Sequence, residues 1–231
     1  MSGSLRVWGI GTARTLRPHW ALAELGIEYE TRDILPRTRG MEDRDFLKVS
    51  QRGKIPILES GDMVIGESGA ILFHLADRYR ETIELSPVAG SDQRAEFDDV
   101  CLFVLTEIDA PLYVIRRHLG LRDVYGESPV AVLAARDYFL RQVSELEKRL
   151  GDGDEFLVGP KFSVADILFS SCLGWAAFIG IDLSSRLTDY QTQVTLRAAY
   201  RKAARKNFSA EAQSAMRYQQ GEVAQLRLEV G

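Results

Sequence analysis

Short apolar runs alternate with amphipathic segments along residues 1–80 of the chain. Strands are predicted for four of the runs, at residues 5–10, 28–34, 57–59 and 63–65. Helices are predicted at residues 16–25, near Phe46-Leu47 and after Ser68. Because Ser60-Gly61-Asp62 is typical of a hairpin turn, the last two strands are expected to be antiparallel, whereas the first two form a parallel βαβ unit. The order β-α-β-α-β-β-α predicts a small mixed sheet in an α/β domain.

Beyond residue 91 the apolar residues recur only at helical spacing, which predicts an all-helical second domain. The periodicity lapses between Glu81 and Gly90, where Ser86-Pro87 is typical of a linker. The predicted division is therefore a first domain at residues 1–80, a linker at 81–91 and a helical domain at 92–231.

Several local signals predict where the helices of the second domain begin and end. Pro111 is expected to kink or end one helix, and Ser128-Pro129 is typical of the start of the next. The segment Ser163-Val164-Ala165-Asp166 has the spacing of a capping box and opens a helix that is apolar on most sides. Residues 186–205 and 210–229 predict further helices.

Composition and charge exclude several classes of function. The 231 residues carry a formal charge of −4 with basic and acidic residues interspersed, so nucleic-acid binding is not expected. No leader pattern and no apolar run of the roughly 20 residues that span a membrane is found, and a soluble cytoplasmic protein is expected. Cys101 and Cys172 lie in apolar helical patterns and are expected to be buried, reduced thiols. Because His19, His74 and His118 form no i, i+4 pair, no metal site is expected.

The segment Gly66-Glu67-Ser68-Gly69 lies between the last strand and a helix, with Ser68 as the expected N-cap. A helix start has unpaired N–H groups and partial positive charge, which favour a bound carboxylate or phosphate. Glu67 would repel such an anion unless it accepts a hydrogen bond from a ligand's ammonium, so a ligand with both charges fits best. In the alternative interpretation, Ser68 only caps the helix and Glu67 is solvated.

The segment Lys54-Ile55-Pro56-Ile57 precedes the third strand, and Pro56 cannot donate a hydrogen bond to a neighbouring strand. The backbone of Ile55 is therefore a candidate to pair with the backbone of a ligand. A cis Ile55-Pro56 bond would aim these groups toward Glu67 and Ser68, whereas a trans bond would only guard the start of the strand.

The loop of residues 9–15 joins the first strand to the first helix and contains two hydroxyls, Thr12 and Thr15. A thiol bound at this helix start would ionise more easily, and a threonine hydroxyl could donate a charge-assisted hydrogen bond to its sulfur. In the alternative interpretation, Thr15 is the N-cap and Thr12 is a loop hydroxyl.

Together, these segments resemble the cytosolic glutathione S-transferases of the bacterial type. The stretches that carry the resemblance are Gly11 to Leu22, Gly53 to Leu58, Gly66 to Ile71 and Phe162 to Asp166. The resemblance implies a thioredoxin-like N-terminal domain, an all-helical C-terminal domain, a homodimer, and glutathione bound in a groove at the domain junction.

The resemblance also implies how glutathione is held. Its γ-glutamyl end would meet Glu67 and Ser68, its cysteinyl backbone would bind Ile55 beside Pro56, and its glycyl carboxylate would lie near Lys54. The thiol would point at the first loop, where Thr12 is the first candidate donor and Thr15 the second.

The catalytic position departs from the family pattern, because the loop has no serine, cysteine or tyrosine. Arg14 could stabilise the thiolate by charge instead of a hydroxyl, and the absent cysteine argues against the disulfide-reducing members. The electrophile pocket is expected around Tyr113, Arg116, Arg117 and His118, although the two arginines and the histidine could also be solvated helix residues. The resemblance implies a transferase that adds the glutathione thiolate to a small electrophile, and a non-catalytic binding or regulatory protein of the same fold is the alternative.

Overall fold

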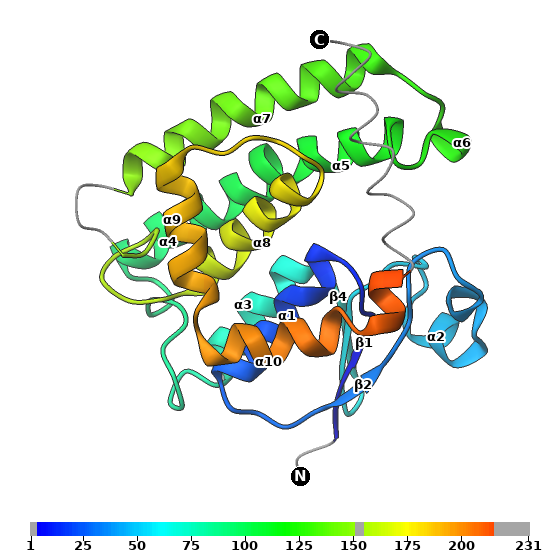
Figure 1. Ribbon diagram of the computed structural model, residues 1–231. Helices are drawn as coiled ribbons and strands as arrows, with labels where there is room; N and C mark the ends of the chain where they lie inside the picture. Colours follow the sequence, from blue (N-terminus) through cyan, green and yellow to red (C-terminus); the bar gives the residue numbers. More distant parts are fainter. Residues whose placement is uncertain (1–3, 151–154, 215–231) are drawn as a thin grey trace. The chain divides into compact units, whose positions relative to one another are not determined.

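The computed structural model describes residues 4–150 and 155–214 (Figure 1). The described chain forms two compact units. The first contains residues 4–87 together with 195–214, and the second contains residues 88–150 and 155–194. Residues 195–214, which the sequence assigns to the helical domain, therefore pack with the sheet, while the division at residues 80 and 91 stays a prediction.

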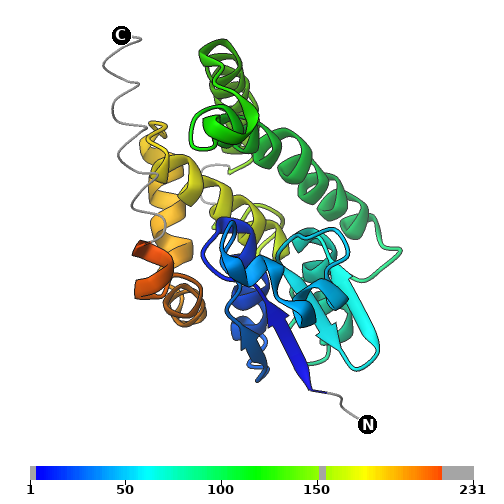
Figure 2. The ribbon, with the colours of Figure 1, turned by 90° about the vertical axis from the view of Figure 1, so that its right-hand side faces the viewer.

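The first unit is built on a four-stranded sheet in the order β2-β1-β3-β4. Its strands are β1 (Leu5–Trp8), β2 (Glu30–Arg32), β3 (Ile57–Ser60) and β4 (Met63–Gly66). Strand β1 pairs parallel with β2 and antiparallel with β3, and β3 and β4 form the expected hairpin (Figure 2). The predicted mixed sheet and element order are confirmed, with a short 3₁₀ turn, η1 (Arg39–Glu42), as an addition.

The helices of this unit are α1 (Ala13–Glu24), α2 (Arg44–Val49), α3 (Ser68–Arg78) and α10 (Ala198–Asn207). Trp8 and Ile57 are register partners, and they cluster with Phe46 of α2 on one face of the sheet. Val7 and Leu58, the next pair in register, are fully buried on the opposite face because side chains alternate along a strand. Both faces of this small sheet are therefore covered.

Helix α10 lies along α1 although the two are far apart in the sequence (Figure 1). The guanidinium of Arg197 donates two hydrogen bonds, of 2.7 and 2.8 Å, to the carboxylate of Glu24. Trp20 donates to the same carboxylate at 3.0 Å, and its ring meets Tyr200 edge-on with centroids 4.8 Å apart. These contacts hold the N-terminal part of α10 against the sheet unit.

The second unit is all-helical, as predicted. It contains α4 (Asp92–Phe103), the π-helical segment η2 (Val104–Asp109), α5 (Ala110–His118), α6 (Arg122–Tyr125), α7 (Pro129–Arg149), α8 (Val164–Phe178) and α9 (Ser185–Thr195). Pro111 lies in the first turn of α5, directly after the π-helical segment η2. A proline has no backbone N–H to donate, and in the first turn of a helix this loss is tolerated. Ser128 and Ser163 cap α7 and α8 as predicted. Cys101 and Cys172 are buried and are not disulfide-bonded, as the sequence predicted.

One predicted helix is wrong in its extent. Residues 186–205 form two helices, α9 and α10, which are separated at Leu196-Arg197. Residues 210–214 are helical, and the rest of the helix predicted for 210–229 lies outside the described residues. In the part of the chain that the structure describes, no helix has the length and apolar character needed to cross a membrane.

Candidate functional site

Helix α3 begins at Ser68, and Glu67 occupies the N-cap position. The predicted N-cap at Ser68 is therefore wrong by one residue. The Ser68 hydroxyl is buried and accepts a hydrogen bond from Nη1 of Arg17 at 3.0 Å. Glu67 makes no capping bond with its side chain, so this helix start keeps N–H groups that a ligand anion could satisfy.

Glu67 presents its carboxylate to solvent at the end of β4. Its backbone has φ 61° and ψ 114°, a region that residues other than glycine rarely adopt. The side chain is 73% exposed and pairs with Arg52 at 3.4 Å. Because exposed pairs of this kind contribute about 0–1 kcal/mol, the pair is easily replaced by a ligand's ammonium.

The Ile55-Pro56 peptide bond is cis. The buried hydroxyl of Ser50 accepts from Lys54 N at 2.9 Å and donates to Lys54 O at 2.8 Å, which fixes the backbone just before Ile55. The N–H and C=O of Ile55 make no hydrogen bond to any residue in the ranges 4–150 and 155–214. Lys54 extends its side chain into solvent. The segment thus offers a backbone donor and acceptor beside an exposed ammonium.

Two contacts bring the predicted segments together within the sheet unit. A Cβ on Gly9 would lie 2.6 Å from Cβ of Ile55, so only glycine lets the end of β1 approach the segment before Pro56 so closely. The hydrogen bond from Arg17 to Ser68 joins α1 to the start of α3. The first loop therefore lies against Ile55, and α1 contacts the start of α3 next to Glu67.

The hydroxyls of the first loop form a capping box at the start of α1. Thr12 is the N-cap and accepts from Thr15 N at 3.0 Å, while Thr15 Oγ1 accepts from Thr12 N at 2.9 Å. The alternative in which Thr15 is the N-cap is therefore wrong. Thr15 is fully buried, whereas Thr12 and Arg14 are partly exposed. Of the two hydroxyls, that of Thr12 is the one that a ligand can reach.

Asn207, the last residue of α10, was missed by the sequence analysis. It is fully buried, and its Oδ1 accepts from Thr15 Oγ1 at 2.7 Å and from Gly11 N at 3.2 Å. Its Nδ2 donates to Thr12 O at 2.9 Å, and its backbone O accepts from Gly11 N at 2.8 Å. No local pattern marks this residue, because its partners lie more than 190 positions away.

His19 fixes the start of the same loop. Its Nε2 lies 3.0 Å from Gly9 O, which can only accept, so Nε2 carries the proton and Nδ1 accepts from the Tyr29 hydroxyl at 2.9 Å. Burial of this neutral ring lowers the pKa of His19 to about 4.

The lowered pKa predicts that the protein loses stability in acid. The unfolded chain binds a proton at His19 near pH 6.5, whereas the folded chain binds it only near pH 4. The contribution of His19 to the free energy of unfolding is therefore fully present above pH 6.5 and is lost as the pH falls from 6.5 to 4. The shift corresponds to about 3 kcal/mol in the free energy of unfolding. Urea unfolding at pH 7 and pH 4.5 checks this, and His19→Gln, which keeps a donor for Gly9 O, is expected to flatten the dependence. Equal pH dependence in both proteins would contradict it.

The predicted electrophile residues lie together in the second unit. The guanidinium carbon of Arg117 is 4.6 Å from the ring centroid of Tyr113 and 5.5 Å from that of Tyr125. His118 donates from Nδ1 to Gly126 O at 2.9 Å. Arg117 is exposed, so this cluster presents a cation held between two aromatic rings.

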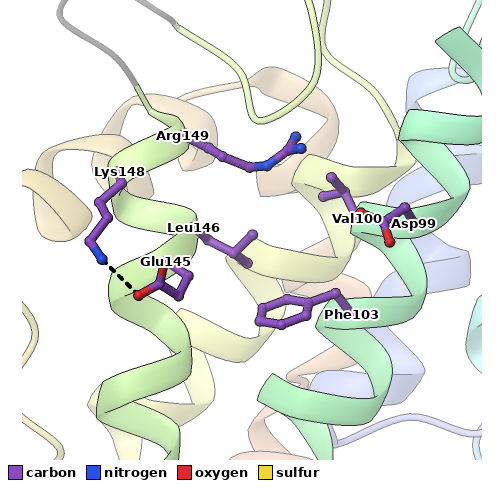
Figure 3. A pocket seen from close by; sticks show the side chains of 7 residues that line it. All are labelled: Asp99, Val100, Phe103, Glu145, Leu146, Lys148 and Arg149. Carbon is purple, nitrogen blue, oxygen red and sulfur yellow. Dashed lines mark hydrogen bonds and ion pairs between the residues drawn. The ribbon is translucent and has the colours of Figure 1, made fainter.

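A cavity of about 420 Å³ lies between α4 and α7 in the second unit (Figure 3). Phe103 and Leu146 point into it from the two helices, and Lys148 and Glu145 form an ion pair of 2.7 Å beside it. Its remaining lining residues are Asp99, Val100 and Arg149. None of the predicted site residues lines this cavity, and its lining contains no cysteine or hydroxyl side chain. Among the described residues, no cluster of three His, Cys, Asp or Glu side chains could hold a metal ion.

Models of a single protein family match segments of this chain in both the first and the second unit. Residues 3–77 match the family described as "Glutathione S-transferase, N-terminal domain", and residues 93–205 match "Glutathione S-transferase, C-terminal domain". Glutathione S-transferase 1 of Schizosaccharomyces pombe is 30% identical over 166 residues, which cover 70% of this chain and 69% of that protein.

Solved structures agree with this result. A bacterial beta class glutathione S-transferase from Sphingomonas chungbukensis is 29% identical, with a TM-score of 0.75 over 87% of this chain and 98% of its own. A sphingomonad glutathione S-transferase complexed with glutathione is 27% identical, with a TM-score of 0.76 over 89% of this chain and 100% of its own.

Proposed function

This chain belongs to the glutathione S-transferase family, and we propose that it binds glutathione at the start of α3 and adds the glutathione thiolate to a small electrophile. One observation carries the proposal. The contact of Gly9 with Ile55 and the bond of Arg17 to Ser68 join three segments that carry a backbone pair, an exposed carboxylate and a hydroxyl. These groups match the backbone, ammonium and thiol of glutathione.

Each end of the tripeptide has a proposed partner in the sheet unit. The γ-glutamyl carboxylate would accept from the first N–H groups of α3 at Ser68, and its ammonium would donate to Glu67. The N–H and C=O of Ile55, beside Pro56, would pair with the cysteinyl backbone. The exposed ammonium of Lys54 would face the glycyl carboxylate.

The proposed reaction is nucleophilic attack by the bound thiolate. The thiol proton leaves to solvent, the sulfur forms a bond to the electrophilic carbon, and the leaving group departs with the electron pair of its own bond. Thr12 donates a hydrogen bond to the thiolate, and the N-terminus of α1 adds its partial positive charge. Thr15 supports Thr12 from the buried side, and Arg14 is the alternative source of charge. Tyr113 and Arg117 are proposed for the electrophile.

A non-catalytic glutathione-binding protein is the second candidate. It is favoured by the loop of residues 9–15, which has no serine, cysteine or tyrosine. Binding of glutathione without turnover of 1-chloro-2,4-dinitrobenzene and other electrophiles would support this candidate over the transferase. A beta-like member of the family, a homodimer and a cytoplasmic location remain parts of the proposal.

The proposed binding site is tested by Glu67→Gln, measured by calorimetric titration with glutathione. The dissociation constant is expected to rise at least about tenfold, because the ligand's ammonium loses a charged acceptor. Asp62→Asn is the matched control, since Asp62 is also an exposed acid and lies at the opposite end of the β3–β4 hairpin. Its dissociation constant is expected to stay within twofold of the wild type. Unchanged affinity in both variants would show that the site is placed wrongly.

A further inference from the structure

We propose that Asn207 is a positioning residue that holds Thr12 in place to activate the glutathione thiol. This inference rests on the proposed function. The chain would thereby use the end of α10, near the end of the described sequence, to complete a loop that lies near its beginning.

The orientation of the Asn207 amide follows from its partners. Gly11 N–H can only donate and Thr12 C=O can only accept, so Oδ1 faces the first and Nδ2 the second. The Thr15 hydroxyl, 2.7 Å from Oδ1, must then be the donor to Asn207. The single proton of Thr15 is thus directed into the interior. The Thr12 hydroxyl, 3.0 Å from Thr15 Oγ1, keeps a proton that it can donate either to Thr15 Oγ1 or outward to a bound thiolate.

The loop needs such support, because its backbone has two positions of high freedom. Gly9 and Gly11 have φ values of 111° and 87°, in the region that favours glycine. Asn207 bonds to Gly11, Thr12 and Thr15, on both sides of the N-cap. Asn207 makes four hydrogen bonds to the loop, including the one that its backbone O accepts from Gly11 N. These bonds offset the conformational entropy that the loop loses when it is held in one conformation.

Asn207 is itself held firmly. The other end of α10 is fixed by the two hydrogen bonds between Arg197 and Glu24, and the Glu24 side chain is only 6% exposed. Near the C-terminal end, the ammonium of Lys206 lies 4.2 Å from the ring centroid of Tyr29, the partner of His19. A rigid helix thus presents one amide to the loop at a fixed place.

The experiment measures the pKa of enzyme-bound glutathione from the ultraviolet absorbance of its thiolate, in the wild type and in Asn207→Ala. The thiol pKa is expected to lie below the free value of about 8.5 in the wild type and to rise by about one unit in the variant. The loss in kcat/KM is expected to be about tenfold at pH 6.5 and to disappear near pH 9, where the thiol ionises without help. Binding of S-methylglutathione, which has no thiol, is expected to stay within twofold.

A double variant tests whether Asn207 acts through Thr12. Asn207→Ala is expected to add little to the thiol pKa in a Thr12→Ala background, and additive shifts would overturn the inference. Arg205→Lys is the matched control, since Arg205 is an exposed residue of α10. If Asn207→Ala does not fold, Asn207→Ser, which cannot reach all three loop groups, is expected to show the same pH-dependent loss.

The outcomes separate this inference from the proposed function. A lowered thiol pKa in the wild type that is unchanged in Asn207→Ala and in Asn207→Ser, with any loss of activity independent of pH, overturns only the role of Asn207. A wild-type protein that does not bind glutathione or does not lower its thiol pKa overturns the transferase proposal and this inference with it.

Discussion

Asp166→Ala is expected to lower the free energy of unfolding by about 4 kcal/mol, which would leave little of the stability of an ordinary domain. Asp166 is fully buried at the start of α8. Its carboxylate accepts from Leu157 N and Ser163 N, both at 2.8 Å, and from the Tyr190 hydroxyl at 2.7 Å. Alanine would leave these donors buried without an acceptor, and each such donor costs about 1–3 kcal/mol.

Urea unfolding followed by circular dichroism measures this loss. Asp189→Ala is the matched control, because Asp189 is an exposed acid on α9 and its change is expected to stay within about 0.5 kcal/mol. Tyr190→Phe removes one donor and leaves the carboxylate its other partners, so an intermediate loss of about 1–2 kcal/mol is expected. The Asp166 carboxylate joins α8 to Tyr190 of α9 and to Leu157 in the segment before α8. This role would be contradicted if Asp166→Ala had the same free energy of unfolding as Asp189→Ala.

The elements that the sequence predicted well have short-range causes. Ser163 and Asp166 are three residues apart and satisfy each other's backbone at the start of α8, so the pattern is complete within one turn. The same holds for Ser128-Pro129 at the start of α7 and for the turn between β3 and β4. In each case the residues that determine the structure are neighbours in the chain.

The elements that the sequence missed depend on distant partners. Ser68 has a residue type that is common at N-caps, yet its hydroxyl accepts a hydrogen bond from Arg17. Glu67, with a positive φ, is the N-cap instead. Asn207 reaches Gly11, Thr12 and Thr15 only because α10 packs along α1. Neither contact is marked by a periodicity or a motif in the sequence. Local patterns therefore predicted the loop of residues 9–15 but not the contacts that Asn207 makes with it.

Thr12→Ala is expected to lower kcat/KM for conjugation of 1-chloro-2,4-dinitrobenzene by about 10- to 100-fold. A hydrogen bond to a charged partner contributes about 1.5–3 kcal/mol, and this one would act on the thiolate. Thr12→Ser keeps the hydroxyl and is expected to remain within threefold of the wild type. Steady-state kinetics at pH 6.5, where ionisation of the thiol limits the rate, measures the difference.

Thr12 also caps α1, so the loss of a cap must be separated from the loss of a donor. Removal of an N-cap costs about 0.5–2 kcal/mol of stability wherever it occurs. Ser91→Ala removes the hydroxyl that caps α4 by accepting from Arg94 N at 3.1 Å, and it serves as the matched control. It is expected to lower stability by a similar amount and to leave kcat/KM within twofold. If Thr12→Ala behaves like Ser91→Ala while Arg14→Gln loses activity, the thiolate is stabilised by the charge of Arg14, and the hydroxyl of Thr12 serves the helix alone.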